Sequence, residues 1–252
     1  MKKVLFILLV PIEIAFLFFL SYFKNVFLNN NLVEAYLLPI FRNILNSNIA
    51  SLFLNGIVNA IFGFIIIFFV GIGFKIPLKG FGFNMLNYKL SIKATIIFLS
   101  VFIPLYVFFG TIAAKHNLFS YTFSFPLNAY NFMFYSFFEL FVSGLEEIYF
   151  RSFLITIFLV LWHPIFKSKR GLEIAAITAS TLIFALRHVG MTMLPFTITY
   201  LVPLQILVVV VMGFSFGYIF VKSKSLLGGY LAHGISNFLI TIFLLVLNLA
   251  LF

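Results

Sequence analysis

The segment Glu146-Glu147-Ile148-Tyr149-Phe150-Arg151 places two carboxylates and a guanidinium inside a long run that otherwise has the character of a membrane helix. Two later apolar segments contain Phe184-x-x-x-His188 and His233-x-x-x-Asn237. An ionisable side chain at the centre of a bilayer costs about 2.5–3.5 kcal/mol on insertion scales. Polar groups placed in three membrane helices at this cost indicate a polar site built inside a membrane protein.

The composition of the chain is typical of a membrane protein. Of its 252 residues, 63% are hydrophobic and 9% are charged, and the mean hydropathy is +1.19. Soluble globular proteins carry about 25% charged residues. We therefore predict an all-α fold, a polytopic transmembrane helix bundle that forms one domain over residues 1–252.

The formal net charge of +10 does not indicate nucleic-acid binding, because the basic residues stand singly or in small clusters between apolar runs. That arrangement is typical of topology signals in membrane proteins. The chain contains no cysteine, which excludes disulfides, cysteine nucleophiles and thiolate metal sites.

Seven apolar runs approach or exceed the length of about 20 residues that spans a membrane. They cover residues 4–23, 51–74, 94–114, 130–162, 174–190, 196–221 and 226–252. The run 130–162 is too long for one upright span, and a break near Gly144 would raise the count to eight membrane helices. Residues 31–48 carry Glu34, Arg42 and several asparagines between apolar positions, so we expect an interfacial amphipathic segment there.

The connections between these runs differ in their basic residues. One side carries Lys2, Lys3, Lys75, Lys79, Lys89, Lys93, Lys167, Lys169, Arg170, Lys222 and Lys224, and the other carries Lys24, Arg42 and Lys115. Cytoplasmic loops of membrane proteins are enriched in Lys and Arg. We therefore expect a multi-pass protein of the cell membrane with a cytoplasmic N-terminus. No small-residue cleavage site precedes Lys24, so the first run is interpreted as a retained helix rather than a signal peptide.

Glu147 and Arg151 stand four residues apart, about 40° from each other around a helix, and can form an ion pair. Pairing of this kind lets a membrane helix carry both charges. The favoured interpretation of this pair is that it orients the helix rather than performing chemistry.

Glu146 points about 100° away from Glu147, and no basic residue lies three or four positions from it to neutralise its charge. It would be protonated, paired with a residue of another helix, or in contact with water in a cavity. A carboxylate in such a setting is suited to work as a general base or acid.

The two histidines of the later motifs are candidate partners for Glu146. His233 and Asn237 lie one turn apart, so both can aim donors at a single point, as an oxyanion hole requires. Phe184 lies one turn before His188 and could buttress its ring. A lone histidine on an apolar helix is more often a packing residue, but two of them beside an unpaired glutamate favour a site.

Other candidates are weaker. Glu139, seven residues before Glu146, lies on a similar face, and Arg187 could anchor Glu139, Glu13 or a substrate carboxylate. His116 and His163 fall in loops or at helix ends, where solvated residues are expected.

Metal chemistry and serine catalysis are less favoured by the sequence. Histidine and glutamate from three helices could bind a metal ion, but the His-Glu-x-x-His zinc motif is absent, and we expect no metal. Ser143 and Ser236 lie near the motifs, but no Gly-x-Ser-x-Gly elbow is present.

The order Glu-Glu-x-x-x-Arg, Phe-x-x-x-His, His-x-x-x-Asn, in separate membrane helices, resembles the CAAX protease and bacteriocin-processing family of intramembrane glutamic endopeptidases. This family includes the type II CAAX prenyl endopeptidases and prokaryotic relatives linked to bacteriocin self-immunity. The resemblance covers about residues 130–245. Residues 1–125 match no motif and would supply N-terminal membrane helices, so 126–252 would hold the catalytic core. The family's core has eight helices.

The resemblance implies a role for each matched residue. Glu146 would be the base that activates a water molecule, and His188 would bind and polarise that water. His233 and Asn237 would stabilise the oxyanion of the tetrahedral intermediate. The residues that support this site would be Glu147, Arg151 and Phe184. The implied reaction is peptide hydrolysis with no covalent intermediate, no cofactor and no essential metal.

Two classes of function remain open from the sequence. The favoured one is an endopeptidase whose partners are the lipid bilayer and a peptide or prenylated protein tail, either CAAX-type or a leader or signalling peptide. The alternative is a non-catalytic membrane immunity or binding protein that retains the polar cluster. A transporter with proton-relay groups is less favoured, because no inverted repeat is visible.

Overall fold

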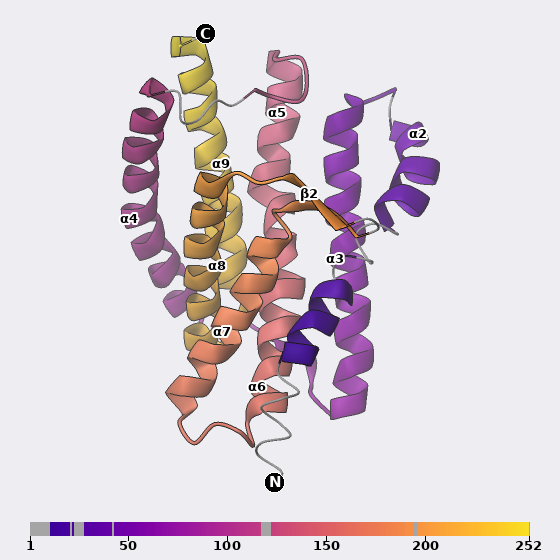
Figure 1. Cartoon of the computed structure of the whole chain (residues 1–252), viewed down its shortest axis with the longest axis vertical. Coiled ribbons are helices and arrows are strands. Elements are labelled where there is room, and N and C mark those ends of the chain that lie inside the picture. The colour runs from indigo at the N-terminus through magenta and orange to yellow at the C-terminus, as the bar shows by residue number, and fades with distance from the viewer. Residues whose placement is uncertain are drawn as a thin grey trace.

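The computed structural model describes residues 11–20, 22, 28–41, 43–116, 122–193 and 196–251, and nearly all of them are helical. Figure 1 shows long helices lying side by side along one axis. The first elements are a helix over Pro11–Leu20, η1 (Leu28–Leu37), α2 (Leu38–Phe41), α3 (Ser47–Phe74), the short turn η2 (Leu78–Phe81) and α4 (Tyr88–Lys115).

The run that carries the first motif forms one helical column (Figure 1). The hydrogen-bonding pattern of its backbone changes along its length. The column consists of α5 (Ala129–Phe137), π-helical η3 (Phe138–Val142), 3₁₀-helical η4 (Ser143–Glu146), π-helical η5 (Ile148–Ile155) and α6 (Thr156–Trp162). The predicted break near Gly144 falls in η4, where the helix tightens but continues. An added Cβ at Gly144 would lie 2.7 Å from the carbonyl oxygen of Tyr230, so the glycine allows a close helix contact here. Departures from α-helical geometry often mark functional sites.

A hairpin interrupts the helices after the second motif. The remaining elements are α7 (Lys169–Leu186), β1 (Gly190–Met193), β2 (Phe196–Tyr200), α8 (Pro203–Ser223) and α9 (Leu226–Leu251), and β1 pairs antiparallel with β2. The expectation of helix through residue 190 and from residue 196 is therefore wrong at these ends. The alternating aromatic and β-branched residues of Phe196–Tyr200 suit a strand, and Pro203 is well placed in the first turn of α8.

Four described helices are long and apolar enough to cross a membrane. They are Ser47–Phe74, Tyr88–Lys115, Pro203–Ser223 and Leu226–Ala250, and they account for four of the seven predicted runs. Pro11–Leu20 is a shorter apolar helix within the first run, part of which lies outside the described residues. The protein is thus a multi-pass helical membrane protein, while the count of seven to eight spans stays a prediction.

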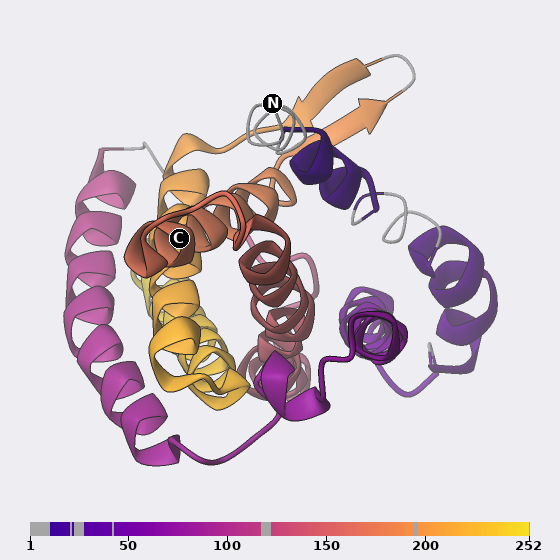
Figure 2. The same ribbon diagram turned by 90° about the horizontal axis from the view of Figure 1, so that it is seen from below.

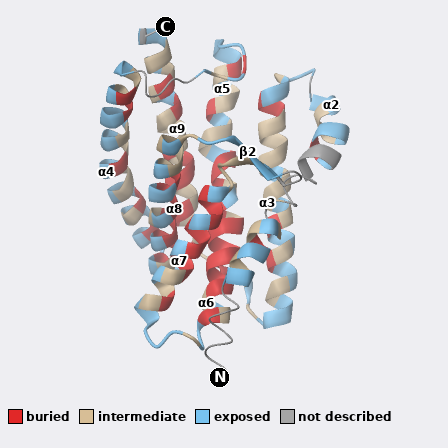
Figure 3. Cartoon of the chain, in the orientation of Figure 1, coloured by how far each residue is buried: buried red, intermediate tan, exposed pale blue. Residues whose placement is uncertain are grey.

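The buried core surrounds the central column. Every side chain from 149 to 158 is buried, and Figure 3 shows the buried residues concentrated around α6 and α7. Figure 2 shows α3 and α4 on opposite sides of this core. Both expose large apolar side chains, for example Phe69 at 66% and Phe108 at 60%. A helix buried all round belongs at the centre of a bundle, and exposed apolar surface of this extent indicates contact with lipid.

Small residues let α8 approach α7. An added Cβ would lie 2.9 Å from Thr181 Cγ2 at Gly213 and 2.9 Å from Ile177 Cγ2 at Gly217. Glycines spaced by four commonly allow such close helix packing in membranes. In this chain they bring the second motif, at the end of α7, close to the elements that follow it.

The segment predicted to be interfacial lies beside α3. It contains η1 and α2, and Ser51 Oγ of α3 donates a hydrogen bond of 3.0 Å to Glu34 Oε1. Tyr36 and Ile40 are exposed. The segment is helical and keeps apolar side chains on its surface, and its interfacial location stays a prediction.

Candidate active site

The carboxylate of Glu147 is the centre of a buried polar cluster. Glu147 and Arg151 are both fully buried, and Glu147 Oε2 lies 2.8 Å from Arg151 Nε. Its other oxygen, Oε1, lies 2.9 Å from His233 Nδ1, although these residues are 86 positions apart. The ion pair that the spacing predicted is therefore present, and a histidine of α9 shares its carboxylate.

Arg151 links the central column to α7. Its Nη1 donates a hydrogen bond of 3.1 Å to Ser180 Oγ, and Ser180 donates in turn to the Phe150 carbonyl over 2.6 Å. The guanidinium carbon lies 4.9 Å from the centre of the Phe184 ring, within the range of a cation–π contact. These contacts give the guanidinium one fixed position.

Phe184 packs between the two histidines of the site. Its ring centre lies 4.8 Å from that of His188 and 6.0 Å from that of His233, both close to edge-to-face. It also meets Phe150 at 4.8 Å. The ring contacts both imidazoles, and its role as a buttress for His188 stays a prediction.

The imidazole of His233 is oriented by its neighbours. Glu147, which also pairs with Arg151, can only accept at the oxygen that faces Nδ1, so Nδ1 carries the hydrogen. The ring also stacks on Phe216 with centres 5.4 Å apart. Nε2 is therefore the nitrogen left for a ligand, in the pattern by which a carboxylate fixes a functional histidine.

His188 follows the last turn of α7 and caps it. Its Nδ1 lies 2.9 Å from the Phe184 carbonyl oxygen, and carbonyls in the last turn lack partners within the helix. Because a carbonyl only accepts, Nδ1 carries the hydrogen and Nε2 offers a lone pair. The end of α7 thus sets the orientation of this imidazole.

Asn237 and Glu139 form a second polar contact across the helices. Asn237 Nδ2 donates a hydrogen bond of 3.0 Å to Glu139 Oε2, and the Tyr135 side chain also hydrogen-bonds to Glu139. His233 and Asn237 thus each hold a different carboxylate in this structure, and their convergence on one oxygen stays a prediction. The sequence left the partner of Glu139 open, because this contact joins residues 98 positions apart.

Glu146 differs from its neighbour Glu147 in being exposed. Within the described part of the chain its carboxylate has no hydrogen-bond or ion-pair partner. Its charge nevertheless acts on five ionisable groups around it: Glu139, Arg151, Arg187, His188 and His233. Glu146 therefore lies among the polar residues of the site while its carboxylate stays free.

A cavity of about 290 Å³ lies among these helices, and the described residues that line it do not include Glu146. Glu139, His188, His233 and Asn237 contribute to its wall, together with Tyr106, Tyr135, Tyr200, Gln205 and Met212. Residues from the column, α4, the hairpin, α8 and α9 therefore meet around one space. The contributions of α4 and the hairpin were not foreseen, since no charged motif marks them in the sequence.

The weaker candidates lie elsewhere or have structural partners. Glu13 Oε2 accepts a hydrogen bond of 2.7 Å from Trp162 Nε1, and His116 and His163 are exposed. The hydroxyls of Ser143 and Ser236 donate to the backbone carbonyls of Glu139 and His233, over 2.6 and 3.0 Å. These contacts place both serines in helix packing rather than at the cavity.

Arg187, the remaining candidate, follows α7 directly. Its guanidinium lies within electrostatic range of Glu146, which places it near the exposed glutamate. Among the described residues, no three side chains of His, Cys, Asp or Glu are grouped closely enough to hold one metal ion.

Gly234, next to His233, sets the distance between α9 and the column. An added Cβ would collide with the Leu140 carbonyl oxygen. We expect Gly234→Ala to separate Asn237 from Glu139 and to destabilise the protein by about 1–3 kcal/mol, as overpacking does. Gly73→Ala is the control, because no atom lies within 4 Å of its added Cβ. Thermal unfolding in detergent measures both, and equal midpoints would contradict this role of Gly234.

A family of known proteins matches part of this chain. Residues 125–239 match the family described as type II CAAX prenyl endopeptidase Rce1-like, and this range includes all three motifs. No curated protein and no solved structure matched the chain. The matched region holds the column, the hairpin and the start of α9, and over this part of the chain the match supports membership of the CAAX protease family.

Proposed function

We propose that this protein is an intramembrane glutamic endopeptidase in which Glu146 activates the water that cleaves a peptide bond. The family supplies the general reaction class, a CAAX-type protease. The observation that carries the proposal is the free carboxylate of Glu146, which acts electrostatically on both His188 and His233. A general base needs a carboxylate within reach of its water and not already committed to a partner.

In the proposed first step, a water molecule is held between Glu146 and Nε2 of His188. The hydrogen bond from His188 Nδ1 to the Phe184 carbonyl supports this, because it leaves Nε2 as an acceptor. Glu146 removes one proton from the water, and the water oxygen attacks the carbonyl carbon of the scissile peptide bond.

The oxyanion formed by this attack would accept hydrogen bonds from His233 and Asn237. Asn237 Nδ2 carries two hydrogens, so one remains when the other is donated to Glu139. His233 donates through Nε2 when it is an imidazolium, a form that the Glu147 carboxylate at 2.9 Å from Nδ1 stabilises. One such preorganised donor typically contributes about 10²–10³-fold in rate.

The proposed intermediate collapses when the bond from carbon to nitrogen breaks. Glu146 returns its proton to the leaving amine, so the water is divided between the new carboxylic acid and the new amine. No side chain forms a covalent bond to the substrate, and Glu146 ends the cycle as the carboxylate that began it.

The substrate of the proposed reaction is a membrane-associated tail or peptide. The cavity of about 290 Å³ suits a short extended stretch rather than a folded domain, and the adjoining strand exposes Phe196 and Ile198. A CAAX-type prenylated tail and a leader or signalling peptide both satisfy these conditions.

The proposal is tested by a cleavage assay in liposomes with two quenched fluorescent peptides, one a prenylated CAAX-type tail and the other a leader peptide. We expect wild-type protein to cleave one of them, with kcat/KM unchanged within about twofold when a metal chelator is added. The reason is that Glu146 and His188 suffice to activate water in this mechanism. Loss of cleavage with chelator, restored by added metal, would contradict it. Cleavage of neither peptide would favour the alternative of a non-catalytic immunity or binding protein.

A further inference from the structure

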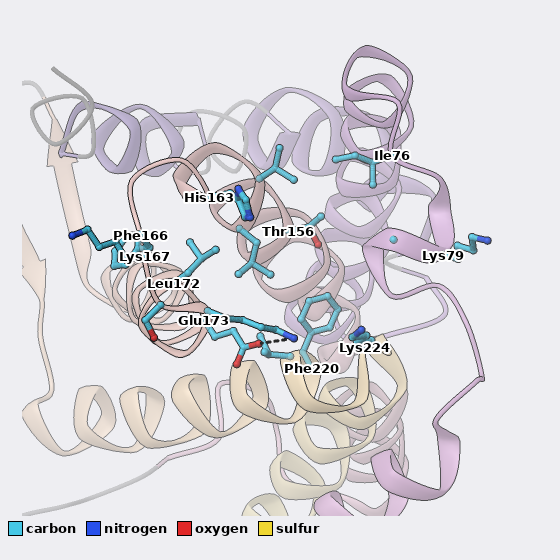
Figure 4. A pocket seen from close by; sticks show the side chains of 16 residues that line it. Ile76, Lys79, Thr156, His163, Phe166, Lys167, Leu172, Glu173, Phe220 and Lys224 are labelled. Carbon is cyan, nitrogen blue, oxygen red and sulfur yellow. Dashed lines mark ion pairs between the residues drawn. The ribbon is translucent and has the colours of Figure 1, made fainter. Parts of the chain in front are cut away.

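A second cavity opens where α6 ends and α7 begins, and none of its lining residues lines the candidate active site. Its volume is about 660 Å³, within the range of roughly 300–1,000 Å³ typical of small-molecule sites. Figure 4 shows its lining from close by. In Figure 1 this region lies at the pole of the bundle where α8 also ends.

The rim of this cavity is strongly basic. Its charged lining residues are Lys79, Lys167, Lys169, Lys224 and a single carboxylate, Glu173. That carboxylate is already engaged, because Glu173 lies 3.9 Å from Lys169 Nζ and 3.5 Å from Lys222 Nζ. In the part of the chain that the structure describes, the other three lining lysines have no acidic partner. Figure 4 shows Lys79 and Lys167 at opposite edges, with Lys224 between them.

The interior of the cavity is apolar. Leu172 and Phe220 are buried at 6% and 4% exposure, and Leu159, Ile76 and Val221 complete this surface. A basic rim above an apolar interior matches a ligand that has an anionic head and a hydrocarbon part. A fully polar anion would leave the apolar surface without a partner.

Two of the basic residues are held in place through their backbones. Asn84 Nδ2 donates hydrogen bonds of 3.1 Å to the Lys79 carbonyl and 2.8 Å to the Lys224 carbonyl. Ser225 Oγ donates in turn to the Asn84 carbonyl over 2.7 Å. Asn84 therefore fixes the spacing of Lys79 and Lys224 on the rim, although these lysines are far apart in the sequence.

We propose that this cavity binds an anionic phospholipid from the surrounding bilayer, with its phosphate among the lysines and its glycerol and first methylenes on the apolar interior. Lysine ammonium groups attract anionic headgroups by about 1 kcal/mol for each residue near the surface, and basic pockets between membrane helices hold such headgroups. The lipid would lie between the connection from α6 to α7 and the end of α8, in contact with both.

The test measures lipid binding to the full-length protein by native mass spectrometry, with short-chain phosphatidylglycerol or phosphatidylcholine added to detergent. Wild-type protein should prefer phosphatidylglycerol by about 25-fold or more. Lys167→Gln combined with Lys224→Gln should weaken that binding by about 25-fold, which is about fivefold for each lysine. Lys167→Arg combined with Lys224→Arg should keep it, whereas Glu173→Gln should strengthen it.

The matched control is Lys89→Gln combined with Lys93→Gln, which removes the same charge from exposed positions at the start of α4. Equal weakening by this control would overturn the proposal, since attraction would then be general rather than local. Equal affinity for the two lipids would also overturn it. Glycerol phosphate alone is the remaining probe, and displacement of phosphatidylglycerol at an equal concentration would show a soluble phosphate site instead of a lipid site.

Discussion

Glu146→Gln should lower kcat for peptide hydrolysis by about 10²–10⁴-fold, the usual contribution of a general acid or base. The amide matches the carboxylate in size but cannot take a proton from water. Glu146 has no hydrogen bond or ion pair within the described residues, so the change removes no stabilising contact. We therefore expect the midpoint of thermal unfolding to stay the same. Steady-state cleavage and unfolding, measured on the same preparation, test both statements.

The control for this substitution is Glu13→Gln, which also changes a glutamate in an apolar helix. Its amide oxygen can still accept the hydrogen bond from Trp162, so both activity and stability should persist. Glu139→Gln tests the rival base, because Glu139 lines the cavity but already accepts a hydrogen bond from Asn237. If Glu139→Gln abolished cleavage while Glu146→Gln left it intact, the assignment of the base would be wrong.

The sequence predicted the parts of this molecule that depend on local spacing. The ion pair between Glu147 and Arg151 follows from their separation of four residues, and it is found at 2.8 Å. The membrane character follows from the apolar runs, and the family follows from three motifs in order. In each case the signal lies in residue types and their order along the chain, and no contact between distant segments is needed to read it.

Contacts between distant segments could not be predicted in the same way. Helical periodicity says which side chains share a face, but not which face of another helix will meet them. The sequence therefore offered His233 as a partner for Glu146, whereas the structure pairs it with Glu147, a contact that depends on how α9 packs against the column. The same holds for Asn237 and Glu139. The hairpin was missed because the residues around Phe196 are apolar enough to resemble a membrane helix.

Arg151→Met should destabilise the protein by about 3–5 kcal/mol, because it leaves the fully buried Glu147 without its cation. The matched control is Lys169→Met, which breaks another ion pair of i,i+4 spacing. The Lys169 side chain is 83% exposed and 3.9 Å from Glu173, so that loss should stay below about 1 kcal/mol. Equal losses in unfolding experiments would show that burial is not the cause.

The double variant Glu147→Leu with Arg151→Met then distinguishes a role of the ion pair in folding stability from a role in catalysis. Replacing both members of a buried pair by apolar residues is often neutral or stabilising, so we expect stability to return to within about 1 kcal/mol of wild type. Cleavage should remain low, because His233 loses the carboxylate at 2.9 Å that orients its ring and stabilises its charged form. Recovery of both stability and activity would mean that the pair only permits folding. Recovery of stability alone would identify Glu147 as the residue that positions His233 for the oxyanion.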